Sequence, residues 1–156
     1  MVETKSIAEL SDLAKQLNSQ SNSLNRYITA LNEQLAPLNL GLEFWYEPPL
    51  AYTGVRLDSS VSPLRKFSVA TFLGYCELED KWQLAIKETT TDYQWNAEYN
   101  EEDTVEEDDY TPLLKASREI RLEATEKFDE FLTGLIAHTK AQLAKIQRAE
   151  KAAKLK

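Results

Sequence analysis

The spacing of hydrophobic residues near the start of the chain predicts a long amphipathic helix. Leucine recurs at every seventh position, and a second series precedes it by three residues in each repeat. The leucines are Leu10, Leu17, Leu24, Leu31 and Leu38, and the second series is Ile7, Ala14, Ser21, Ile28 and Leu35. Leucine at position d of a heptad is typical of a coiled coil. Leu13 and Tyr27, however, widen the stripe, which is typical of a helix packed inside its own domain. The sequence therefore leaves open whether the stripe packs within the chain or between two chains.

Local signals predict where this first helix begins and ends. Ser6 and Glu9 have the spacing of a capping box, which predicts an N-terminus at Ser6. Pro37 and Gly41 predict the end. Asn and Ser, which are poor helix formers, are enriched from 18 to 25, but the leucine register continues through them. One helix is therefore expected, with a bend in this stretch left open.

A second long helix is predicted from Thr111 to the end of the chain. Thr111 is a suitable N-cap, and Pro112 suits the first helical position, where its missing N–H costs nothing. Apolar residues then follow a spacing of eleven, which keeps them on one face of a nearly straight helix. The stripe is strong up to Ile136 and thins to alanine with Leu143 and Ile146 beyond it.

This helix is too long for its own globule. It would span ~60 Å, whereas a compact chain of this length is only ~40 Å across. We therefore predict that its end, about residues 138–156, projects, frays, or packs on another copy or another protein.

Alternation of apolar and polar residues between the helices predicts a small antiparallel sheet. The clearest runs are 67–76 and 82–87, and the polar residues 79–81 between them predict a hairpin. Leu42–Glu47 is predicted as an earlier strand. A short strand around Val55–Leu57 is compatible with the sequence.

The order of elements predicts the fold class. Thr89–Trp95, rich in Thr and aromatic residues, either extends the second hairpin strand or forms another. Leu50–Pro63 is expected to be mostly connection. We predict one domain, residues 1–156, with an α+β fold: two long antiparallel helices, N- and C-terminal, packed on one face of a small antiparallel sheet of three or four strands.

The charge of the chain is local. The net charge is −8, but eight of the 26 acids lie between Glu98 and Asp109. Because like charges repel one another, about 97–110 is predicted to be an acidic, solvated loop. The last helix is basic from His138 onward, yet no aromatic residue follows Phe131 and no nucleic-acid motif is present. Binding to nucleic acid is therefore not expected.

Composition argues against several classes of protein. A single cysteine, Cys76, excludes an internal disulfide and fits a reducing compartment. No apolar run reaches 18 residues, so we expect no membrane span, no signal peptide and a cytoplasmic location. One His and one Cys cannot make a zinc site, and the acidic run lacks the glycine of a calcium loop. No cofactor is expected. The sequence contains no recognisable pair of a base with a nucleophile, so an enzyme is not expected.

One group of residues before and at the start of the last helix is a candidate ligand site. Ser117, Arg118 and Arg121 lie where this helix should meet the sheet, and Tyr93 and Trp95 precede them. Arginine beside aromatic rings at a helix start could hold an anionic or planar ligand. The same arginines could instead form a salt bridge that fixes helix to sheet, or lie over an aromatic ring at the surface.

The function predicted is non-enzymatic protein–protein interaction or assembly. It would use the far half of the last helix, with Leu143 and Ile146 as contacts, and the leucine face of the first. The expected partner is another protein or a second copy of the chain in a homo-oligomer. The alternative is a ligand- or nucleic-acid-binding regulatory domain that uses the sheet aromatics with Arg118 and Arg121.

Overall fold

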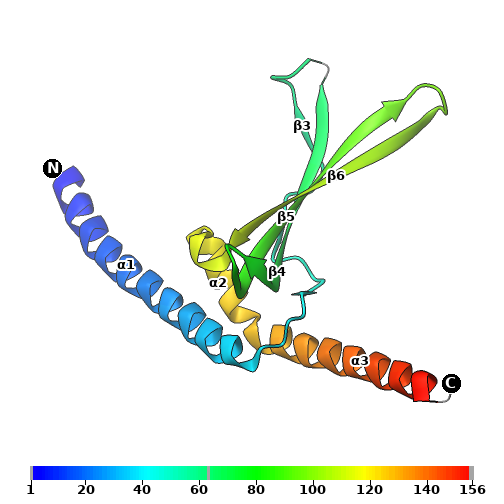
Figure 1. The fold of residues 1–156 in the computed structure, drawn as a ribbon. Coiled ribbons are helices and arrows are strands. Elements are labelled where there is room, and N and C mark those ends of the chain that lie inside the picture. Colours follow the sequence, from blue (N-terminus) through cyan, green and yellow to red (C-terminus); the bar gives the residue numbers. More distant parts are fainter. Residues whose placement is uncertain (1, 63, 155–156) are drawn as a thin grey trace.

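A computed structural model describes residues 2–62 and 64–154 of the protein, with side chains from Thr4 onward. Pro63, expected to end a connection, and Lys156, the last base of the predicted helix, lie outside the described residues. In chain order, the elements are α1 (Val2–Leu35), the 3₁₀ turn η1 (Ala36–Leu38), β1 (Phe44–Trp45), β2 (Ala51–Tyr52), β3 (Arg56–Asp58), β4 (Arg65–Leu78), β5 (Lys81–Asn96), β6 (Glu101–Pro112), η2 (Leu113–Lys115), α2 (Arg118–Glu126) and α3 (Phe128–Lys154) (Figure 1). The fold is α+β with long helices at both ends.

An antiparallel sheet forms the body of the molecule. The long strands β4 and β5 are its centre, β6 pairs with β5, and the short strands β1, β2 and β3 share the other edge of β4. The predicted hairpin is confirmed: Glu79 and Asp80 connect β4 to β5 with φ of 53° and 62°. A two-residue turn with positive φ matches the twist of the paired strands.

The sheet has more strands than predicted. Thr89–Trp95 extends β5, which resolves the alternative left open by the sequence. The stretch Leu50–Pro63, expected to be mostly connection, contributes β2 as well as β3. Both strands are short and pair only with β4, so their local pattern carries little signal.

From Glu101 the acidic stretch is a strand, β6, so the prediction of a loop is wrong there; residues 97–100 form a turn, and the acids are exposed as predicted. The repulsion argument fails because consecutive side chains of a strand point to opposite faces, which separates neighbouring acids. Donors on β4 and β5 also stabilise the carboxylates: Lys66 Nζ donates to Glu102 at 2.9 Å and Thr89 Oγ1 donates to Asp108 at 2.7 Å. An exposed, charged edge strand also resists pairing with other chains.

One face of the sheet carries the hydrophobic core. Across β4 and β5, Leu73 is opposite Ile86 and Tyr75 is opposite Leu84, so all four side chains share this face. The buried cluster also contains Ile28, Leu35, Leu113, Ala124, Phe131 and Leu135. The helices therefore meet the sheet through the second half of α1, through α2 and through the start of α3. Asn32 Oδ1 accepts a hydrogen bond of 2.8 Å from Leu84 N and ties α1 to β5.

The helix predicted from Thr111 starts later and is broken. Thr111 and Pro112 pair with β5, so they end β6 and do not cap a helix. Ser117 is the N-cap of α2, and its side chain accepts from Ile120 N at 3.3 Å. At Lys127 the backbone N–H bonds to Ala124 O, and this tight turn separates α2 from α3. The helix direction changes there (Figure 1).

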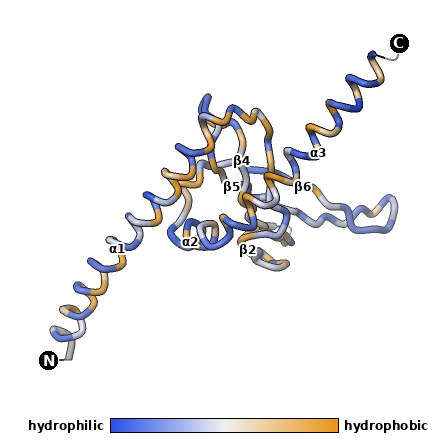
Figure 2. Tube along the Cα trace, turned by 90° about the horizontal axis from the view of Figure 1, so that it is seen from below, coloured by the Kyte–Doolittle hydropathy of each residue, from blue (hydrophilic) through white to orange (hydrophobic). Residues whose placement is uncertain are grey.

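The two long helices do not lie side by side. α1 and α3 project from opposite sides of the body in both views (Figures 1 and 2). Side-by-side antiparallel packing was predicted from two long stripes, but α1 reaches the core near its C-terminal end and α3 near its N-terminal end. The free ends therefore point apart. At its own start, α1 begins at Val2, so Ser6 lies inside the helix and is not its N-cap.

Candidate interaction surface

The second half of α1 is covered by its own chain. Ser21, Ile28 and Leu35, at successive a positions of the heptad, are all buried. The core cluster and α2 lie against this side of the helix. Between Ser21 and Leu35, the heptad is therefore used for packing within the chain.

The first half of α1 carries the same stripe with nothing over it. Ile7, Leu10, Leu13 and Leu17 are between 51% and 64% exposed. All described residues of α1 up to Gln20 are exposed, and this part of the helix extends away from the body (Figure 2). We call Ile7, Leu10, Leu13 and Leu17 the open stripe. This apolar row continues the register of the covered half of the helix.

The far end of α3 is a second exposed surface. Leu143 and Ile146, the contacts expected from the sequence, are 53% and 57% exposed. They lie among the bases of the tail, and none of those bases takes part in an ion pair within residues 64–154. This surface has fewer large apolar side chains than the open stripe and a strong positive charge.

The arginines of the predicted ligand site bind α1. Arg118 Nη2 donates to Asn18 Oδ1 at 3.1 Å, and Arg121 donates to Asn25 Oδ1 and, at 3.3 Å, to Ser21 Oγ. These contacts attach α2 to α1 and use the Asn- and Ser-rich stretch that looked unfavourable for a helix. The arginines thus have a structural task, although it is helix-to-helix hydrogen bonding and not a salt bridge to the sheet.

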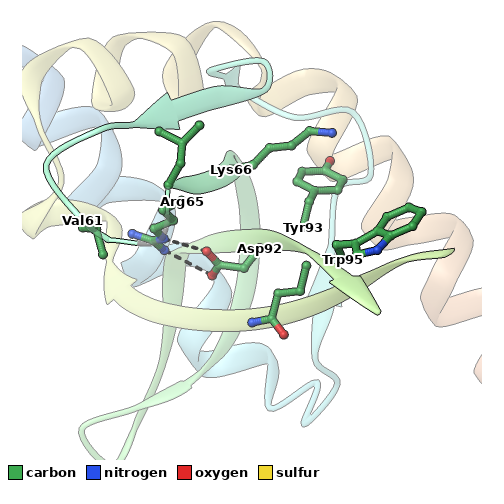
Figure 3. A pocket seen from close by; sticks show the side chains of 8 residues that line it. Val61, Arg65, Lys66, Asp92, Tyr93 and Trp95 are labelled. Atoms are coloured by element: carbon green, nitrogen blue, oxygen red, sulfur yellow. Dashed lines mark hydrogen bonds and ion pairs between the residues drawn. The ribbon is translucent and has the colours of Figure 1, made fainter. Parts of the chain in front are cut away.

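The aromatic residues of the predicted site lie elsewhere. Tyr93 and Trp95 line a cavity of about 730 Å³ between the start of β4 and the far part of β5. Among the residues that line it, Arg65 donates from Nε and Nη2 to the two carboxylate oxygens of Asp92 at 2.6 and 3.1 Å (Figure 3). The structure therefore separates these rings from the arginines and Ser117 of α2. The sequence did not reveal the ion pair, because it depends on the register of β4 against β5.

The face of the sheet without helices carries an aromatic cluster. The Trp45 ring lies directly over Gly74, and the Tyr110 ring centre is 5.6 Å from it. Lys87 Nζ sits 5.0 Å from the Trp45 ring centre and 5.3 Å from that of Phe72. The Lys87 ammonium therefore already has cation–π contacts within the cluster.

The described residues offer few groups that could bind a metal or act as a nucleophile. No group of three or more potential metal ligands occurs among them, and none of their helices is long and apolar enough to cross a bilayer. Burial and the nearby Glu43 carboxylate raise the pKa of Cys76 to about 11, which keeps its thiol protonated. A protonated, buried thiol is a poor nucleophile. The cytoplasmic location stays a prediction.

Comparison with known proteins does not supply a family. No protein-family model, no curated protein and no solved structure matches the chain. The function is therefore argued from the surfaces alone.

Proposed function

We propose that this protein is a non-enzymatic interaction module that binds its partner through the open stripe of α1. The observation that supports this proposal is one heptad row with two different environments. Ser21, Ile28 and Leu35 are buried and Leu24 and Leu31 are half-buried, whereas Ile7, Leu10 and Leu17 are exposed. A heptad row of apolar side chains that extends beyond its own domain is typical of a helix that a second helix covers.

The energy available from the open stripe suits a reversible interaction. Complete burial of a Leu or Ile side chain contributes ~1.5–3 kcal/mol. Since the four side chains are already 36–49% covered, the complement of their 51–64% exposure, only about half of this is available from each. Acids and bases balance over residues 4–20, namely Lys5 and Lys15 against Glu9 and Asp12. Neither sign of charge therefore opposes a partner helix.

Photo-cross-linking in the native cells tests the proposal. Benzoylphenylalanine replaces Leu10 in one variant and Asp12, on the opposite side of the heptad, in a control. We expect an adduct only from position 10. That adduct should disappear with Leu17→Glu and persist with Ser19→Glu, because Ser19 also points away from the stripe. The absence of any adduct at position 10 would refute the proposal.

A small planar ligand in the Tyr93–Trp95 cavity is the second candidate function. Its volume lies within the range of small-molecule sites, and Trp95 is 65% exposed beside it. Arg65 and Lys66 are already paired with Asp92 and Glu102, so the ligand would rely on ring stacking and not on free positive charge.

A thermal-shift screen with planar aromatic compounds tests this second candidate. A ligand in the cavity should raise the melting temperature of the natural protein and of Arg121→Lys, and fail to do so in Trp95→Ala. A shift that persists in Trp95→Ala would place the ligand elsewhere.

A further inference from the structure

The arrangement of the open stripe around Asp12 points to a particular partner. We propose that the partner is a second copy of this chain, whose α1 lies antiparallel to the first with the two-fold axis at the level of Asp12. This inference rests on the proposed function and adds the identity and direction of the partner. Ile7 then faces Leu17 of the second copy, and Leu10 faces its Ala14. Position a meets position d in every layer, as antiparallel heptads require.

A parallel pair is excluded by the chain itself. In a parallel pair the second helix would continue along the same side of α1 beyond Leu17. That side is occupied by α2, through Arg118 on Asn18 and Arg121 on Ser21, and then by the core around Ile28. In the antiparallel pair the second helix runs toward the free end of α1, and only its first residues, 2–6, come level with the stretch from Asn18 to Asn22 that α2 contacts. The two bodies then lie at opposite ends of the pair.

The chemistry along the overlap matches in the antiparallel direction. The polar residues Thr4 and Ser6 lie level with Asn18 and Gln20 of the second copy, and the apolar residues lie between these two ends. Leu13, beside the seam, approaches its own counterpart across the axis.

Charge also agrees with this arrangement. Glu9 lies level with Lys15 of the second copy, and the two Asp12 side chains point away from the seam. The e and g positions that flank the seam are uncharged between residues 4 and 20. No like charges are therefore forced together.

The size of the overlap predicts a weak dimer. Residues 4–20 form about 25 Å of helix, which is short compared with the interfaces of permanent complexes. We therefore expect monomer and dimer to exchange at micromolar concentration.

Disulfide trapping tests both the partner and its direction. Ile7→Cys and Leu17→Cys are prepared separately, one of them with a mass tag, and oxidised alone and as a mixture. In the antiparallel pair, like positions are about 15 Å apart along the axis, too far for a disulfide. We expect at least ~10-fold more cross-linked dimer in the mixture than in either variant alone, because only unlike positions meet.

Two controls and a second measurement complete the test. Asp12→Cys should not cross-link in either direction, and the natural protein, with only the buried Cys76, is the background. Sedimentation of the natural protein should show a dimer that forms with concentration. Cross-linking of each variant alone would overturn the antiparallel arrangement. A monomer at every concentration would overturn the second copy as partner, while an adduct of another mass in the photo-cross-linking experiment would leave the proposed function standing.

Discussion

Replacement of Gly74 by alanine tests how closely the Trp45 ring packs on the sheet. A Cβ at position 74 would lie 2.0 Å from Cε3 and 2.4 Å from Cζ3 of Trp45. These distances are far below contact, so the indole would have to leave its place. It would then lose its contact with Tyr110 and the 2.7 Å hydrogen bond from Nε1 to Glu43.

The magnitude follows from two opposed effects. Forcing extra volume into a packed site costs ~1–3 kcal/mol. Alanine in place of glycine inside a strand contributes ~0.5–1 kcal/mol in the other direction. We expect Gly74→Ala to lower the free energy of unfolding by about 1–2 kcal/mol in the natural protein. In a Trp45→Ala background the clash is absent, and the same change should stabilise by about 0.5 kcal/mol.

A double-mutant cycle measures this difference. Urea unfolding of the four proteins is followed by circular dichroism, because Trp45→Ala alters the fluorescence. The two positions should be coupled by about 1.5–2.5 kcal/mol. If Gly74→Ala is as stable as the natural protein, the Trp45 ring does not lie on Gly74 and the reasoning fails.

Three further predictions concern hydrogen bonding and ionisation. Asn32→Ala should lower the free energy of unfolding in urea by ~1–3 kcal/mol, because it leaves a strand N–H without its acceptor, whereas Asn22→Ala at an exposed position should change little. The hydrogen bonds from Arg65 lower the pKa of Asp92. This carboxylate therefore stabilises the fold above its unfolded pKa of ~3.9, and the stabilisation is lost as the pH falls through the lower folded pKa. The difference in free energy of unfolding between the natural protein and Asp92→Asn should shrink below about pH 4. Burial raises the pKa of Cys76 to about 11. The stabilising contribution of the neutral thiol is therefore present below the unfolded pKa of ~8.5 and is lost as the pH rises through the folded pKa. At pH 8 the thiol should react with a disulfide reagent only after addition of urea.

The sequence alone determined the features that depend on neighbours along the chain. Heptad spacing predicted the long first helix and its stripe, because positions seven apart on a helix share one face. Alternation predicted the central hairpin, because side chains two apart on a strand share one face. The thinning of the apolar stripe after Ile136 likewise predicted that the far end of α3 leaves the core, and Leu143 and Ile146 are exposed there.

Tertiary structure alone decided the features that depend on distant partners. Thr111 and Pro112 suit a helix start, but β5 supplies the pairing that makes them the end of a strand. The acidic stretch becomes β6 for the same reason. The sequence left Arg118 and Arg121 between a ligand site and a structural role, and their hydrogen bonds to α1 give them the structural role. The stripe of α1 has one local pattern throughout, and only the position of α2 and the sheet leaves its first half open, since coverage depends on which surfaces meet and not on the order of residues.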